Sequence, residues 1–398
     1  MRNRLCEFLL IASSQQAAQN GGSVKKLIRR TFAFILLTTF ILIIDNQNVF
    51  AGSTDVMNEF DFDDIEEFIN NDEDLEDINF KEIANDFMLG DANGGLKEIW
   101  TYVKDVLFDE IINNFRVLKK ILYISILAAI LTNFMKVLKN SQVSDTGFIV
   151  CYMVIISLVI TSFTALSALA YMTIKRMTEF MKALIPVYMV SVGVSDGQVY
   201  AASYYQMALV VITIIDICCL KLLLPIIDIY VVLSIVSNLH SEDYLSKACT
   251  LIKNITSFSV KAMLSVVMAI NVIRQMFSPV SDGIRNTTVT NVLGIVSGMG
   301  NSAGNIASLV YGTGNILKSA IGGAGLIVLM MIVLIPIVKI VIFVFSYQFT
   351  NAFLQPVSDD RIIKCMEGIS EGAILMLRIV FSVSLMFVIT IAIVCMRN

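Results

Sequence analysis

Long apolar runs occupy most of the chain. Phe148–Tyr171 and Gly322–Tyr347 contain almost no charged side chain, whereas a helix on the surface of a soluble protein carries polar residues at helical spacing. Further runs lie at about Ile121–Leu138, Tyr204–Val236 and Gly372–Cys395. Because about 20 apolar residues cross a hydrocarbon core of about 30 Å, the pattern predicts an all-α polytopic membrane protein with roughly five to seven transmembrane helices.

Two stretches do not fit a single simple span. Phe180–Val194 is short and contains Pro186, which leaves a kinked span, a re-entrant piece and an interfacial helix as alternatives. Tyr204–Val236 is longer than one span needs and contains Pro225, which suggests a tilted, broken or doubled helix. A turn is expected at Asn140–Gly147. Lysines balance on the two sides of the first span, so they do not decide the topology.

Two further helices are predicted to be amphipathic and to carry a polar stripe. The first covers about residues 251–278, a turn follows around Pro279–Gly283, and the second covers about residues 291–316. The stripe on their polar faces is made of Ser257, Lys261, Ser265, Asn291, Ser297, Asn301, Asn305, Ser308 and Asn315.

The near absence of charge in this stripe matters for its interpretation. A charged face marks a helix surface in water, whereas Asn, Ser and Gly suit either close helix packing or the wall of a narrow aqueous path. Ten of the 21 glycines lie between Gly283 and Gly325, and two of the spacings are Gly-x-x-x-Gly. Packing is favoured over a conduit lining, and both stay open. The second alternative is the hypothesis that several copies, or partners, form an aqueous path along these helices.

The N-terminal residues 1–51 have the order of a signal sequence. Lysines and arginines precede the apolar run Thr31–Ile44, and Val49, Phe50 and Ala51 place small residues where a signal peptidase reads. An uncleaved first transmembrane helix is the alternative. In either case residues 52–96 are expected outside the cytoplasm, and residues 97–398 form the polytopic membrane domain.

Charge is distributed unevenly along the chain. The net charge is only −4, yet Asp55–Asp91 holds fifteen acidic residues against one basic residue, Lys81. Such a segment repels phosphate, so nucleic acid is not an expected partner. A solvated acidic linker or a loosely helical spacer is the favoured interpretation.

The sequence offers no recognisable catalytic, cofactor or metal site. The single histidine, His240, has no triad or ligand spacing around it, and the seven cysteines contain no Cys-x-x-Cys pair. Asp216, Lys221 and Asp228 lie in or near an apolar run, where ionisable groups are functional candidates. They suggest a proton or ion relay, or they mark an interfacial break around Pro225. A non-enzymatic membrane protein is expected.

Several segments together resemble the stage III sporulation protein AE family. They are Ser281–Arg285, the glycine-rich helix, Lys318–Gly325, Ile335–Pro336 with Lys339, and Phe353–Pro356. The order of a signal sequence, a short extracytoplasmic segment and a polytopic domain is also similar. The likeness covers about residues 97–398.

The resemblance implies a place in the mother-cell membrane around the forespore of a sporulating bacterium. It implies membership of a channel or secretion-like complex that joins the two cells and is needed for late forespore development. The implied partners are other proteins of the stage III sporulation operon, including a cytoplasmic ATPase, and a forespore membrane partner; a homo-oligomer is also open. The alternatives are an independent transporter or permease, and a membrane scaffold without a conduit.

Overall fold

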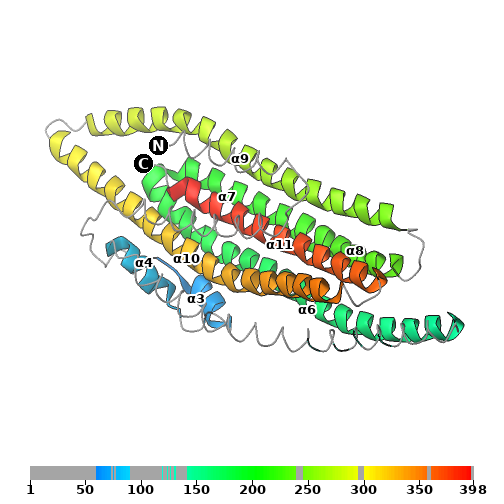
Figure 1. Ribbon diagram of the computed structural model, residues 1–398. Coiled ribbons are helices and arrows are strands. Elements are labelled where there is room, and N and C mark those ends of the chain that lie inside the picture. Colours follow the sequence, from blue (N-terminus) through cyan, green and yellow to red (C-terminus); the bar gives the residue numbers. More distant parts are fainter. Residues whose placement is uncertain are drawn as a thin grey trace. The chain divides into compact units, whose positions relative to one another are not determined.

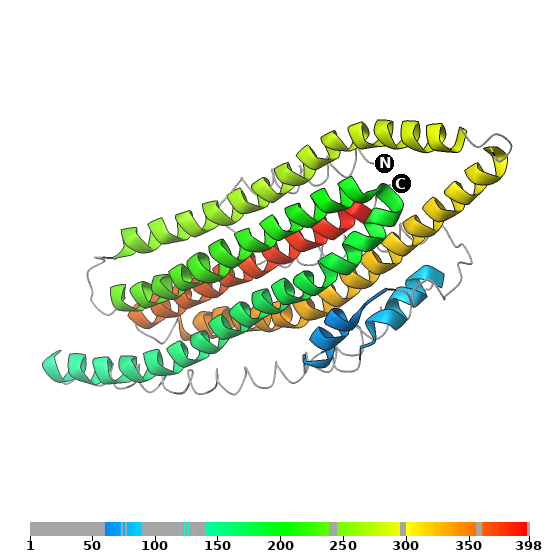
Figure 2. The same ribbon diagram turned by 180° about the vertical axis from the view of Figure 1, so that it is seen from behind.

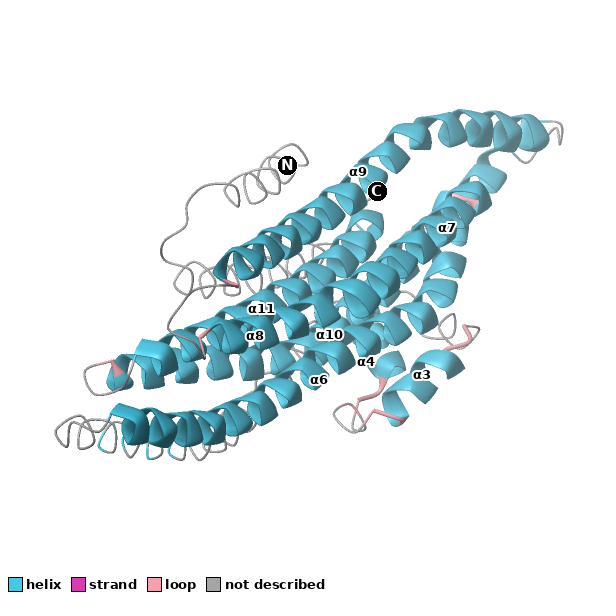
Figure 3. Cartoon of the chain, turned by 90° about the vertical axis from the view of Figure 1, so that its right-hand side faces the viewer, coloured by secondary structure: helices cyan, strands magenta, loops and turns pink. Residues whose placement is uncertain are grey.

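The computed structural model describes residues 60–72, 75, 78–89, 119, 123, 126, 130, 141–238, 245–294, 300–355 and 360–395. All of them lie in one compact unit, Asp45–Asn398. Every regular element in these residues is a helix, which confirms the predicted all-α class (Figures 1 and 3). The elements are α3 (Asp63–Asn70), α4 (Phe80–Leu89), α6 (Ser141–Asp196), α7 (Gln198–Ile214), the π-helix η4 (Ile215–Leu223), α8 (Leu224–Ser237), α9 (Ser246–Gly294), α10 (Gly300–Leu354) and α11 (Asp360–Cys395).

Five helical segments in the described part of the chain are long and apolar enough to cross a membrane. They are Tyr152–Asp196, Gln198–Ser237, Ser246–Val272, Thr313–Ala352 and Asp360–Cys395. The count agrees with the prediction of a multi-pass membrane protein. The longest segment has 45 residues and extends about 68 Å, more than twice the thickness of a hydrocarbon core.

Helix α6 is longer than the sequence pattern suggested. The turn expected at Asn140–Gly147 is wrong, because α6 is helical from Ser141 onward. The unassigned stretch Phe180–Val194 is the last part of the same helix, with Pro186 inside it. A polar residue or one proline does not end so long a helix, since proline removes a single backbone hydrogen bond from many.

The chain reverses between α6 and α7 at a single residue. Gly197 has φ of 93°, a left-handed conformation that a side chain rarely adopts, and its amide donates to the Gly193 carbonyl at 3.1 Å. The long stretch after this turn is a continuous helical path through α7, η4 and α8. Pro225 lies in the first turn of α8, where a missing N–H is tolerated.

Helices α9 and α10 also differ from the expected boundaries. The turn predicted around Pro279–Gly283 is wrong, because α9 is helical through these residues and ends at Gly294. The second polar-striped helix is not a separate element either. Most of it is continuous with the next apolar span in α10, which begins at Gly300. The glycines and the proline therefore lie inside long helices, which their packing partners stabilise.

The core of the bundle is formed by α10 and α11. In their most apolar stretches 72% and 78% of residues are buried, compared with 28% for the corresponding stretches of α6 and α9. Helix α10 contacts α6, α11 and α4, whereas α9 contacts α8 and α11. In Figures 1 and 2, α9 lies on the opposite side of the bundle from α3 and α4.

The acidic segment is packed against the bundle, which differs from the predicted linker or spacer. In α3 and α4 one face is apolar and buried, including Ile65, Ile69 and Phe80. Asp72, which follows α3, forms a bidentate ion pair with Arg176 of α6. The apolar residues of this segment are spaced three and four positions apart, as on one face of a helix. The sequence interpretation overlooked this spacing because acidic residues dominate the segment.

Other predicted N-terminal features lie largely outside the described residues. This applies to the signal sequence at residues 1–51. Of the first predicted span, only Tyr123, Ile126 and Ile130 are described, and all three are helical and exposed.

Candidate functional site in the helix bundle

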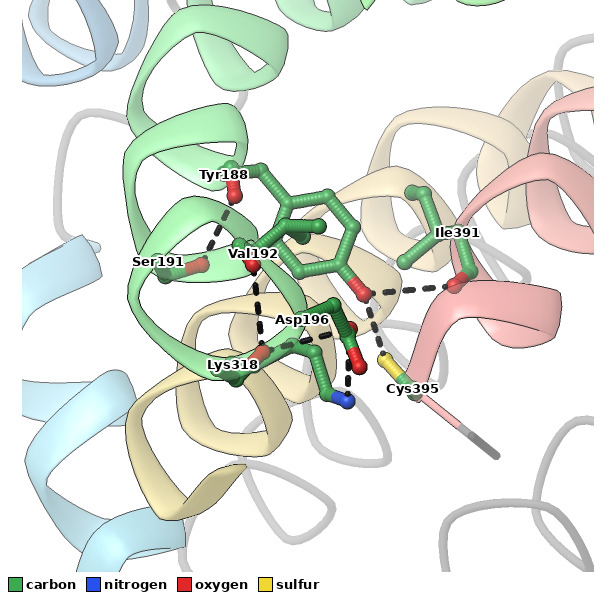
Figure 4. Close-up of polar contacts among 8 residues, drawn as sticks. Tyr188, Ser191, Val192, Asp196, Lys318, Ile391 and Cys395 are labelled. Carbon is green, nitrogen blue, oxygen red and sulfur yellow. Dashed lines mark hydrogen bonds and ion pairs between the residues drawn. The ribbon is translucent and has the colours of Figure 1, made fainter. Parts of the chain in front are cut away.

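A buried ion pair joins the end of α6 to α10. Lys318 Nζ lies 3.1 Å from a carboxylate oxygen of Asp196, and the two side chains are 1% and 10% exposed (Figure 4). The same carboxylate oxygen accepts a hydrogen bond from Ser195 Oγ at 3.2 Å. A charge buried alone among apolar helices is strongly disfavoured. The pair therefore ties the axial position of α10 to the turn at Gly197.

A tyrosine beside this pair connects α6 to α11. Tyr188 is fully buried, and its hydroxyl lies 3.3 Å from the Ile391 carbonyl and 3.0 Å from Cys395 Sγ (Figure 4). Its ring also meets the edge of the Tyr204 ring of α7, with centroids 5.5 Å apart. Four helices thus converge around the end of α6.

Glycines allow α10 to approach its neighbours closely. We name Gly322, Gly323 and Gly325 the glycine seam. A Cβ atom added at these positions would lie 2.3 Å from Cys395 Sγ, 2.7 Å from the Phe87 ring and 2.6 Å from a Leu184 methyl group, respectively. The seam is therefore filled by side chains of α11, α4 and α6. Here the glycine spacing serves helix packing.

A second polar network joins α8, α9 and α11, and its side chains are more exposed than those of the buried pair. Glu371 forms an ion pair with Lys253 and accepts a hydrogen bond from Tyr230 Oη at 2.8 Å. Arg378, two turns further along α11, lies 3.5 Å from Ser257 Oγ. These contacts attach the edge of α9 that carries Lys253 and Ser257 to the bundle, whereas its buried face carries Val260, Met263 and Val267.

The outward face of α9 is mostly apolar and exposed. Leu251, Ile255 and Phe258 are 59%, 47% and 73% exposed. On a helix in water, an outward face would carry mostly polar residues. The arrangement suits a helix whose outer face meets lipid or another membrane helix.

The predicted polar stripe is divided among different environments. Ser257 contacts Arg378, Lys261 and Ser265 are exposed, and Asn315 is half-buried. Asn291, Asn301, Asn305 and Ser308 lie in helices, but their side chains are outside the described part of the structure. Ser297 lies outside the described residues. The conduit hypothesis for this stripe stays a prediction.

The three predicted intramembrane charges do not form one cluster. Asp216 of η4 pairs with Lys182 at 3.5 Å, and Asp228 of α8 accepts a hydrogen bond from Ser167 Oγ at 2.8 Å. Lys221 is exposed. The acidic members are thus held separately along one helical path, each by its own contact with α6.

Sequence reasoning missed Asp196, Lys318 and Glu371. Asp196 and Lys318 are 122 residues apart in sequence, so no local spacing relates them. Their signal is weaker but present, because each is a single charge at the edge of a long apolar run. Among the residues with described side chains, no group of three His, Cys, Asp or Glu is arranged to hold a metal ion.

Comparison with known proteins extends over this whole helical region. A family model described as Stage III sporulation protein AE matches residues 78–397. The curated protein "Stage III sporulation protein AE" of Bacillus subtilis (strain 168) is 26% identical over 310 residues, which cover 78% of each chain. No solved structure matches. The matched region begins just before α4 and includes every later helix.

Proposed function

This chain belongs to the stage III sporulation protein AE family, and from this premise we propose that it is a membrane component of a channel or secretion-like complex between mother cell and forespore. It acts in the mother-cell membrane around the forespore and is needed for late forespore development. Its partners are other proteins of the stage III sporulation operon, including a cytoplasmic ATPase, and a forespore membrane protein.

The filled glycine seam supports a particular form of this proposal. The side chains of Cys395, Phe87 and Leu184 occupy the space beside α10 where a path through one chain would run. A conduit formed with this chain therefore lies between chains. It is bordered by several copies or by partners, and the core of each chain stays closed.

Helices α6 and α9 offer the surfaces for such an assembly. Only 28% of the residues in their most apolar stretches are buried, so the others have surface left for lipid or for a neighbouring membrane helix. The exposed stripe member Ser265 lies on α9 among apolar residues. It places a polar group where a neighbouring chain would enclose water.

Cysteine accessibility in sporulating cells tests this proposal. Ser265→Cys and Asn301→Cys should react with a membrane-impermeant thiol reagent, above the labelling of the parent chain with its own cysteines. Thr256→Cys is the matched control, because Thr256 lies on α9 and is fully buried. Complete protection of both Ser265→Cys and Asn301→Cys would contradict a conduit along these helices and would favour a scaffold.

An independent transporter is the second candidate, and one observation favours it. Asp216 and Asp228 lie within an apolar helical path and contact Lys182 and Ser167 of the neighbouring helix. Neutralisation of Asp216, Lys221 and Asp228 separates the two functions. A loss of sporulation with the complex still assembled would support transport by this chain, whereas normal sporulation would remove the main argument for it.

A further inference from the structure

Three exposed lysines lie near the middle of three neighbouring candidate membrane spans, Tyr152–Asp196, Gln198–Ser237 and Ser246–Val272. They are Lys175 of α6, Lys221 of η4 and Lys261 of α9, and we call them the lysine belt. Lys175 is 51% exposed, and among the described residues its ion pair is with the exposed Glu179 of the same helix, at 3.6 Å. Lys221 and Lys261 have no ion pair with a residue that the structure describes.

Contacts between the helices place the three lysines at one level. The helical path through η4 and α8 runs antiparallel to α6, with Asp216 in contact with Lys182 and Asp228 in contact with Ser167. Lys221 lies about midway between the two aspartates, and Lys175 lies midway between their partners on α6. The two lysines therefore lie within about one turn of each other. Cys219 Sγ lies 4.0 Å from Met263 Sδ. Lys221 and Lys261 are each two residues from that contact, on helices that run in opposite directions.

Beyond the belt and the ion pairs next to it, Lys175–Glu179 and Lys182–Asp216, the surface is apolar on both sides. On one side Val210 and Val266 are 48% and 47% exposed, and on the other side Val232 and Phe258 are 53% and 73% exposed. From Phe148 to Ile174 of α6 no charged residue occurs, and the same holds for Gln198–Ile215 of α7 and η4. The belt thus separates two apolar zones of the helix surface.

A lysine at the centre of a bilayer is disfavoured by roughly a hundredfold in partitioning. Three exposed lysines at one level therefore exclude that level from the middle of the hydrocarbon. Close to an anionic leaflet, by contrast, each lysine favours the surface by about fivefold. The helices have room for this arrangement, because the segment Tyr152–Asp196 alone is about twice as long as a bilayer requires.

From these observations we infer that the lysine belt lies at the headgroup level of the membrane and binds the phosphates of anionic phospholipids. Consequently only one half of the long helices is surrounded by hydrocarbon. The other half projects beyond the headgroups, where neighbouring chains or partners cover its apolar residues.

Lipid selectivity in nanodiscs tests the binding. The full chain is reconstituted in phosphatidylglycerol mixed with phosphatidylcholine, and the ratio of the two lipids that stay bound is measured by native mass spectrometry. The triple variant K175Q/K221Q/K261Q should lose a several-fold enrichment of phosphatidylglycerol. The matched control K119Q/K247Q/K364Q, which neutralises three other exposed lysines, should keep it. Equal enrichment in both triple variants would overturn the inference.

Depth measurement tests the position without removing the whole belt. Spin labels at Lys175, Lys221 and Lys261, introduced one at a time, should report the depth of the phosphates. Of two further labels, at Val210 and Val232, one should report hydrocarbon and the other water or protein contact. Belt labels at the bilayer centre, or hydrocarbon at both valines, would contradict the inference.

Discussion

The buried ion pair between Asp196 and Lys318 yields a sharp prediction for stability. Asp196→Asn removes the negative charge and leaves the ammonium of Lys318, only 1% exposed, without its carboxylate. At 3.1 Å, two unit charges attract each other by about 5 kcal/mol with an effective dielectric constant of about 20. Because desolvation offsets part of this attraction, the expected loss in unfolding free energy is about 3–5 kcal/mol.

A double-mutant cycle isolates this interaction. Lys318→Met alone should destabilise the protein in the same way, whereas the combined variant D196N/K318M should recover most of the stability, since no uncompensated charge stays buried. Unfolding of the full chain is followed in detergent micelles by loss of helical circular dichroism as sodium dodecyl sulfate is added.

Asp216→Asn is the matched control for the same assay. Its partner Lys182 lies 3.5 Å away, and the two side chains are 33% and 50% exposed. Neither side chain is enclosed by the bundle, so loss of this pair should cost far less than loss of the buried pair, less than about 1 kcal/mol. If Asp196→Asn destabilised the chain no more than Asp216→Asn does, the buried pair would not have the structural role assigned to it.

Three further variants test separate contacts. Gly322→Ala should cost about 1–3 kcal/mol in the same unfolding assay, because its Cβ meets Cys395 Sγ at 2.3 Å, while Gly193→Ala, with its nearest atom at 3.7 Å, should be tolerated. Arg176→Gln should release the acidic segment and speed proteolysis within residues 60–89, and the charge exchange R176D/D72R should slow it again; unchanged cleavage in Arg176→Gln would refute this. Glu371→Gln should weaken the contact of α9 with α8 and α11 by about 1–2 kcal/mol, because it removes the charge that Lys253 and Tyr230 contact. The expected result is faster proteolysis of residues 245–272. An unchanged rate would show that these contacts do not hold α9.

The sequence predicted the membrane class well because apolar length is a direct signal. Runs such as Gly322–Tyr347 have no other common explanation, and the structure places this one in α10. Helix boundaries were predicted less well. Pro279 and Pro186 suggested breaks, yet α9 and α6 continue through them, because tertiary packing outweighs the loss of one backbone hydrogen bond.

The contacts within the bundle were beyond sequence reasoning for a different reason. Asp196 and Lys318 meet only because α6 and α10 pack side by side, and no local pattern specifies that pairing. The acidic segment shows the converse case. Its composition suggested a solvated spacer, although Ile65 and Ile69 lie four residues apart on a buried face.

Purification of the native complex from sporulating cells, followed by a structure of the assembly, tests the central claim most directly. The account predicts that the glycine seam of every copy is closed by Cys395, Phe87 and Leu184, and that any conduit runs between chains beside α9. A water-filled path through a single copy, between its own α6, α10 and α11, would contradict it.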